Sequence, residues 1–187
     1  LCLALGAQAQ LLWKISGNGL EHPSYIVGTH HLAPLSVKDS LKALPQAIEQ
    51  TSQVYGEVVM DDMMKPETMQ AMQQAMMLPA DTTLKSLFTP SEYDSIASVV
   101  KTYIGMDLAL FDKLKPAALT TQLSVALAAK SVKGFNPQEQ LDTWFQAQAK
   151  QAGKKVGGLE SIEQQIDVLY HSQSLQRQAH LLYCAAT

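Results

Sequence analysis

Three short runs of β-forming residues lie within the first 60 positions, and the segments between them restrict how the strands can pair. Residues 11–16 and 24–29 are separated by a turn that contains a Gly-Asn-Gly sequence at 17–19, which favours an antiparallel hairpin. Residues 53–60 follow a segment of helical pattern, and a strand–helix–strand order is typical of parallel pairing. We therefore expect a central mixed sheet with an N-terminal hairpin, in which strand 53–60 lies parallel to strand 24–29.

Most of the remaining chain has the pattern of helices. Proline is tolerated in the first turn of a helix, and four prolines stand where a helix can begin: Pro66, Pro90, Pro116 and Pro137. A further short strand is expected at 154–160, followed by helices up to the end of the sequence. The chain has 187 residues and 47% hydrophobic residues, which suits one domain with its own core. The predicted class is α/β, close to α+β, with many helices around the sheet.

Charge and hydropathy argue against nucleic-acid binding and against a transmembrane segment. The net charge is −3 and the sequence contains no basic run, so we expect no nucleic-acid partner. No segment approaches the roughly 20 consecutive apolar residues that a transmembrane helix needs. The sequence therefore predicts a protein without a transmembrane segment.

The first ten residues, LCLALGAQAQ, differ from the rest of the chain. They are small and apolar, and Ala7-Gln8-Ala9 has the A-x-A form of a signal-peptidase site. We interpret residues 1–10 as the remnant of a signal peptide, with an ordinary apolar strand as the alternative. The protein is then expected to be exported, to the periplasm or the extracellular space, and residues 11–187 to form the domain.

Seven of the eight methionines lie between Met60 and Met77. Met69, Met72 and Met76 fall on one face of a predicted helix. Such a face can bind an apolar ligand or copper, or it can pack against the rest of the protein. Packing against the sheet is the favoured interpretation, because methionine commonly fills irregular gaps in a core. Copper is the least favoured, because no histidine or cysteine lies between these methionines.

Two histidines directly follow the strand predicted at 24–29, in the sequence GTHHLAP. Because His30 and His31 are adjacent, only one of them needs to face a site. Glu57 lies within the apolar run 53–60, and burying a lone ionised carboxylate is costly. If the two strands are parallel neighbours, histidine and glutamate form half of a metal site or an acid–base pair. The alternative is that the histidines are exposed loop residues or capping groups.

The segment LLWKISGNGLEHPSYIVGTHHLAP resembles the opening of the TraB/GumN family, which includes the Tiki proteases. Gly28 and His31 fit the G-x-x-H motif of that family, with His30 at a variable position. Glu57, in VYGEVVM, matches the glutamate of the family's next strand. The segments LKPAAL and QLDTWFQAQAKQAGKKVGGLESIEQQ resemble two later blocks of the family, so the resemblance spans residues 11–187 as one domain.

The resemblance implies an α/β fold and, for the Tiki branch, a metal-dependent protease with two G-x-x-H motifs and a glutamate. Of such patterns, Gly28 to His31 is the one placed at the strand end, and no G-x-x-H occurs later in this sequence. Either the domain is truncated at its C-terminal end and the second motif lies in a longer chain, as we expect, or the protein lacks half of the site of the family. Related proteins include erythromycin esterases and a haem-binding lipoprotein, so the scaffold does not determine one chemistry.

The motif and the resemblance together predict an exported metal-dependent hydrolase of the peptidase type, acting on a peptide or a small molecule. His31 and Glu57 are expected to bind a divalent metal (Mn, Co or Zn), or to act as bases toward water. Gly28, His30 and Glu160 are secondary candidates. Glu160 either lines the same cleft or supports the start of the helix that follows it. The alternative function is binding of haem, a metal or another small ligand without turnover.

Overall fold

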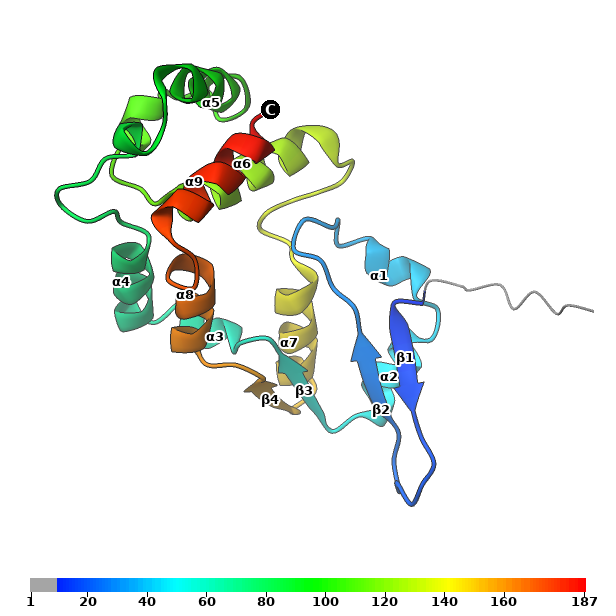
Figure 1. Cartoon of the computed structure of the whole chain (residues 1–187). Coiled ribbons are helices and arrows are strands. Elements are labelled where there is room, and N and C mark those ends of the chain that lie inside the picture. Colours follow the sequence, from blue (N-terminus) through cyan, green and yellow to red (C-terminus); the bar gives the residue numbers. More distant parts are fainter. Residues whose placement is uncertain (1–9) are drawn as a thin grey trace, which may run out of the picture.

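The computed structural model describes residues 10–187 as two small β-sheets and a set of helices (Figure 1). The mixed α/β class predicted from the sequence is confirmed. The elements in chain order are β1 (Leu12–Ile15), β2 (Ser24–Val27), α1 (Val37–Ser40), α2 (Leu44–Gln50), β3 (Gln53–Gly56), α3 (Met60–Met63), α4 (Pro66–Ala75), η1 (Lys85–Leu87), α5 (Pro90–Tyr103), η2 (Leu108–Phe111), α6 (Pro116–Ser131), α7 (Leu141–Gln151), β4 (Lys155–Gly158), α8 (Ile162–Tyr170) and α9 (Leu175–Ala185).

The predicted N-terminal hairpin is confirmed. β1 and β2 pair antiparallel, from Leu12 opposite Val27 to Ile15 opposite Ser24. The residues at 17–19 all have positive φ angles, which glycine and asparagine adopt more readily than other residues. The turn chemistry of the sequence thus closes this hairpin.

The pairing predicted for strand 53–60 is wrong. β3 pairs in parallel with β4, while β2 pairs only with β1, so residues 10–187 form two sheets of two strands rather than one central sheet. The glycines of β4 explain this choice. A Cβ atom at Gly157 would lie 2.4 Å from the ring of Tyr55, so only glycine lets that ring lie across β4.

Helix α7 connects the two sheets. It packs against β3 and β4, and a residue in its first turn, Asp142, accepts a hydrogen bond from Thr29 in the loop after β2. In Figure 1, β3 crosses α7, and β2 lies to the right of both. The C-terminal ends of β2 and β3 therefore approach the same end of α7, although no backbone hydrogen bond is formed between those two strands.

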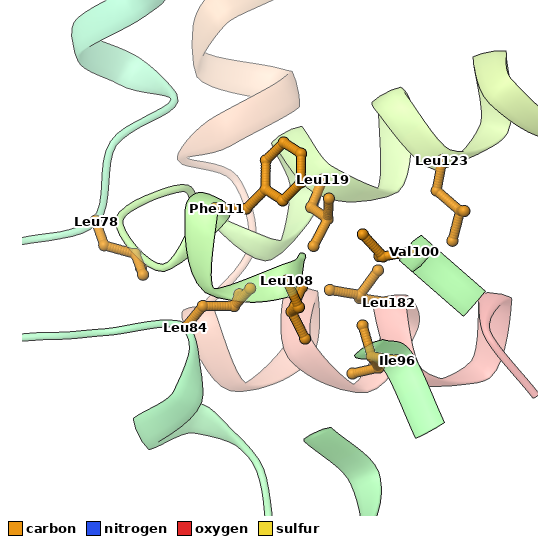
Figure 2. Close-up of a cluster of buried hydrophobic side chains, with 9 residues drawn as sticks. All are labelled: Leu78, Leu84, Ile96, Val100, Leu108, Phe111, Leu119, Leu123 and Leu182. Carbon is orange, nitrogen blue, oxygen red and sulfur yellow. The ribbon is translucent and has the colours of Figure 1, made fainter. Parts of the chain in front are cut away.

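The helices form a separate apolar core, in which α6 packs against α9 and α5. Figure 2 shows nine buried side chains of this cluster, contributed by α5, α6, α9 and the loops between α4 and α6. Leu119 and Leu182 are completely buried within it. Full burial of a leucine contributes about 1.5–3 kcal/mol, so this cluster accounts for much of the stability of the fold.

Helix starts follow the prolines with one exception. Pro66, Pro90 and Pro116 each begin a helix. The helix predicted from Pro137 begins at Leu141 instead, because the Asn136 side chain accepts a hydrogen bond from the backbone N–H of Gln138 and forms a turn.

The methionine face packs, as favoured from the sequence, but against helices instead of the sheet. Met72 and Met76 contact a buried cluster formed by α4, α6 and α8, whereas Met69 is exposed. No helix formed by residues 10–187 is long and apolar enough to cross a membrane. The predicted signal-peptide remnant, apart from its last residue, lies outside the described residues.

Candidate functional site

Three segments that are distant in the sequence meet at the C-terminal ends of β2 and β3. The loop after β2 contributes Thr29 and His31, the residue after β3 is Glu57, and the first turn of α7 contributes Asp142. His31 lies between the two carboxylates. Its Nε2 atom is 3.7 Å from Oε2 of Glu57, and its Nδ1 atom is 3.5 Å from Oδ2 of Asp142.

The two carboxylates differ in their exposure to solvent. The side chain of Asp142 is 14% exposed, whereas those of His31 and Glu57 are 58% and 57% exposed. The Oδ1 atom of Asp142 accepts a hydrogen bond of 3.1 Å from the Thr29 hydroxyl. Its Oδ2 atom is buried and accepts no hydrogen bond within residues 10–187. The 3.5 Å contact with His31 is thus an ion-pair contact that is longer than an ordinary hydrogen bond.

These contacts shift two pKa values in opposite directions. The carboxylate of Asp142 raises the pKa of His31 above its ordinary value, the charge of Glu57 adds to this effect, and partial burial opposes it. His31 in turn lowers the pKa of Asp142, helped by the hydrogen bond from Thr29 and opposed by burial. The fold therefore favours a charged pair of Asp142 and His31.

The backbone on both sides of Glu57 is fixed by hydrogen bonds. The N–H groups of Leu159 and Glu160 donate to the carbonyl oxygens of Gly56 and Glu57, at 2.9 and 2.8 Å. The buried amide of Gln146, on α7, donates to the carbonyl of Val58 and accepts from the N–H of Met60. Because α7 carries both Gln146 and Asp142, the same helix holds Glu57 and His31 in place.

Gly56 makes this arrangement possible. A Cβ atom at position 56 would lie 2.5 Å from the amide nitrogen of Gln146. Any larger residue would displace that amide and the backbone beside Glu57. The glycine before the glutamate is therefore a packing requirement of the site.

Glu57 itself lies where the sequence did not predict it. It was expected inside an apolar strand, yet β3 ends at Gly56 and Glu57 is the first residue beyond it. Its side chain is exposed, so the expected cost of burial does not arise. Glu57 nevertheless contacts His31, which is the pair of residues that the sequence predicted to lie together.

The secondary candidates are not brought to His31. The Nδ1 atom of His30 accepts a hydrogen bond from the N–H of Leu32, within its own loop. The Glu160 side chain accepts one from Gln165, and the cap of α8 is Ser161. A Cβ atom at Gly28 would meet only Leu11, at 3.8 Å, so space does not require glycine there.

Asp142 and Thr29 are the members of the site that the sequence did not reveal. Thr29 is part of the GTHH segment, but threonine beside a strand end is common. Asp142 lies in the first turn of a helix, where an acidic residue also has an ordinary role with the helix dipole. Only the packing of α7 against the loop after β2 distinguishes Asp142 from such residues.

The chemistry of these groups suits a divalent metal only in part. An imidazole nitrogen and a carboxylate oxygen are donors that Zn, Mn and Co accept, and a carboxylate behind the histidine is usual in such sites. A catalytic zinc site has three protein ligands. Within residues 10–187, no group of three histidine, cysteine or acidic side chains could hold a metal. Within the described part of the chain, His31 and Glu57 are the two candidate ligands that lie together on the exposed side of the site.

The model of the TraB/PrgY/gumN family matches residues 11–186, which is nearly the whole chain. No curated protein and no solved structure matches the chain. The match includes all four residues of the site.

Proposed function

Since the chain belongs to the TraB/PrgY/gumN family, we propose that it is a hydrolase whose reacting groups are His31 and Glu57. The observation that carries this proposal is the position of His31 between a buried and an exposed carboxylate. A histidine that contacts a carboxylate through one ring nitrogen presents its other nitrogen to a substrate or to water. The exposed sides of His31 and Glu57 allow a substrate to approach.

His31, Asp142 and Glu57 have different roles in the proposed reaction. Neutral His31 accepts a proton from an attacking water molecule and, once charged, donates that proton to the leaving group. Asp142 stabilises the imidazolium that forms in between. Glu57 accepts a second hydrogen bond from the water and orients it toward the substrate. The peptide bond or ester is then cleaved with no net change in the protonation of the protein.

His31 and Glu57 would also be the residues that hold a divalent metal, with the remaining positions filled by water or by groups outside residues 10–187. Bound there, Mn, Co or Zn would act as a Lewis acid and lower the pKa of water. Metal binding would require neutral His31, so it should weaken as the pH falls through the raised pKa of His31.

Binding without turnover is the second candidate. It is favoured by the exposure of His31 and Glu57 and by the number of metal ligands, which is two within the described residues. In that case the site would hold haem, a metal or another small ligand. An absorption spectrum of the purified protein tests haem, and elemental analysis tests the metals.

The activity is tested on the longest natural form of the protein. Hydrolysis of a mixed peptide library and of simple esters is measured with Mn, Co or Zn added, and again with a chelator. We expect His31→Gln and Glu57→Gln to lower kcat/KM by about 100-fold or more. His30→Gln is the matched control, because it removes the neighbouring exposed histidine, and it should leave activity within twofold. Equal activity of the wild type and His31→Gln would refute the proposal.

We also propose that the protein acts outside the cytoplasm, because residues 1–10 resemble the end of a signal peptide. N-terminal sequencing of the protein recovered from the periplasm should give a start near Gln10. Recovery of the protein from the cytoplasm alone would contradict export.

A further inference from the structure

Asp142 is the buried member of the site, and its two oxygen atoms face different residues. Oδ1 accepts the hydrogen bond from the Thr29 hydroxyl, and Oδ2 lies 3.5 Å from Nδ1 of His31. No donor within residues 10–187 forms a hydrogen bond with Oδ2. His31 is thus a side chain 3.5 Å from this buried oxygen that could donate a proton to it.

A neutral imidazole carries one proton, and its tautomer decides which carboxylate receives a donor. With the proton on Nδ1, the N–H faces Asp142 and the lone pair of Nε2 faces the side of Glu57. With the proton on Nε2, Glu57 gains a donor and the buried oxygen of Asp142 faces a lone pair. The two tautomers therefore satisfy different carboxylates.

Burial decides between the two tautomers. The Glu57 side chain is 57% exposed, so water can replace any hydrogen bond that His31 does not make. The Asp142 side chain is 14% exposed and its Oδ2 atom is buried, so water cannot do the same there. Leaving a buried carboxylate oxygen without a donor costs more than leaving an exposed one to solvent. The Nδ1–H tautomer is the more stable of the two.

We propose that Asp142, itself held by Thr29, is a positioning residue that fixes neutral His31 in the Nδ1–H tautomer. Nε2 is then the atom that accepts a proton or binds a cation, on the side of Glu57. The catalytic consequence rests on the proposed function. The tautomer itself requires neither a substrate nor a metal, so it can be tested independently.

The test is nitrogen-15 NMR of the histidine rings, in metal-free protein, at a pH where all five imidazoles are neutral. The His31 signals are assigned by their loss in His31→Gln. In the wild type we expect Nδ1 of His31 to be protonated and Nε2 to carry the lone pair. In Asp142→Asn the new amide can donate to Nδ1, so the proton should move to Nε2.

Thr29 provides a matched pair of variants. Thr29→Ser keeps the hydroxyl and should keep the Nδ1–H tautomer, whereas Thr29→Val removes the donor to Asp142 and should reduce the preference for it. If Asp142→Asn does not fold, which its amide spectrum would show, the Thr29 pair tests the proposal. An Nε2–H tautomer in the wild type, or a tautomer that none of these folded variants changes, would overturn it.

Activity supplies a second readout. In the hydrolase, Asp142→Asn should lower kcat by about 10- to 100-fold and leave KM within twofold, because the residue acts through His31. An active enzyme with the Nε2–H tautomer would refute only the role of Asp142. The Nδ1–H tautomer in a protein without hydrolytic activity would support the role of Asp142 and contradict the proposed function.

Discussion

Two regions of the molecule differ in the kind of large side chain that they bury most deeply. In the helical region (66–131 and 162–185), the large side chains that are completely buried are apolar, as Leu119 and Leu182 are. In the sheet region (12–63 and 141–158), the large side chain that is buried to the same degree is Gln146, a polar residue. The outer face of the hairpin even exposes Trp13 and Ile26, which lie opposite each other.

This difference suggests that the helical region contributes most of the stability and that the sheet region positions the residues of the site. Apolar burial is non-directional and contributes stability in proportion to area, so the helical region can hold the fold together. Hydrogen bonds are directional, and those made by Gln146 and Asp142 fix the positions of specific atoms. The sheet region thus provides precise placement of His31 and Glu57 with fewer fully buried large apolar side chains than the helical region has.

The largest expected effect is the loss of a core leucine in the helical region. Leu119→Ala should lower the free energy of unfolding by about 2–5 kcal/mol, because Leu119 is completely buried in the apolar cluster. Thermal and urea unfolding measure this loss. Below the melting temperature the site should remain intact. A variant that is stable but inactive would show that the two regions are not separable in this way.

Gln146→Leu removes the hydrogen bonds that hold the backbone next to Glu57. Leucine has a similar size but leaves the carbonyl of Val58 and the N–H of Met60 without their partner. We expect a loss of about 1–3 kcal/mol in stability and, in the hydrolase, a larger loss of activity than Leu119→Ala causes. Gln148→Leu, on the same helix, is the control, since among residues 10–187 the Gln148 side chain bonds only to the neighbouring side chain of Gln151. Equal effects of the two variants would contradict the role assigned to Gln146.

Gly157→Ala tests the pairing of β3 with β4. The added Cβ atom would lie 2.4 Å from the ring of Tyr55, and strain from overpacking usually costs about 1–3 kcal/mol. Part of this cost should be relieved in the double variant with Tyr55→Ser, because the ring that collides is gone. Additive effects of the two substitutions, measured by urea unfolding, would show that the predicted collision does not occur.

The sequence was sufficient for the local parts of the fold. The turn at 17–19 specified the hairpin, and three of the four prolines singled out in the sequence mark the start of a helix. The partner of β3 could not be predicted, because it depends on how Tyr55 packs on Gly157, about 100 residues away in the chain. Long-range pairing is determined by such contacts, which no local pattern records.

The same limit applied to the site. His31 and Glu57 were identified from the GTHH segment, the apolar run 53–60 and the family resemblance, and the structure brings them together. Asp142 was missed, since its importance comes from the burial of one carboxylate oxygen beside His31. The burial of Glu57 was predicted wrongly because an apolar run in sequence was equated with a continuous strand, which in fact ends at Gly56.

The smallest predicted effect is the dependence of stability on pH that the pair of His31 and Asp142 produces. Because the pKa of His31 is raised, its contribution is complete below about pH 6.5 and disappears as the pH rises through the raised value. Because the pKa of Asp142 is lowered, its contribution is complete above about pH 4 and disappears as the pH falls. Both contributions are therefore complete between about pH 4 and 6.5.

The free energy of unfolding of the wild type and of Asp142→Asn, measured across this range, should differ most inside that window. The excess should be no more than about 1 kcal/mol, because His31 is 58% exposed and solvent screens the pair. Asp167→Asn is the matched variant in the helical region, where the carboxylate lies 3.6 Å from His171 and both side chains are exposed. Asp167→Asn should change the free energy of unfolding less than Asp142→Asn does. Solvent screens the exposed pair of Asp167 and His171 more strongly than a pair in which one partner is buried. A difference that is constant with pH for Asp142→Asn would mean that Asp142 acts only through its bond to Thr29.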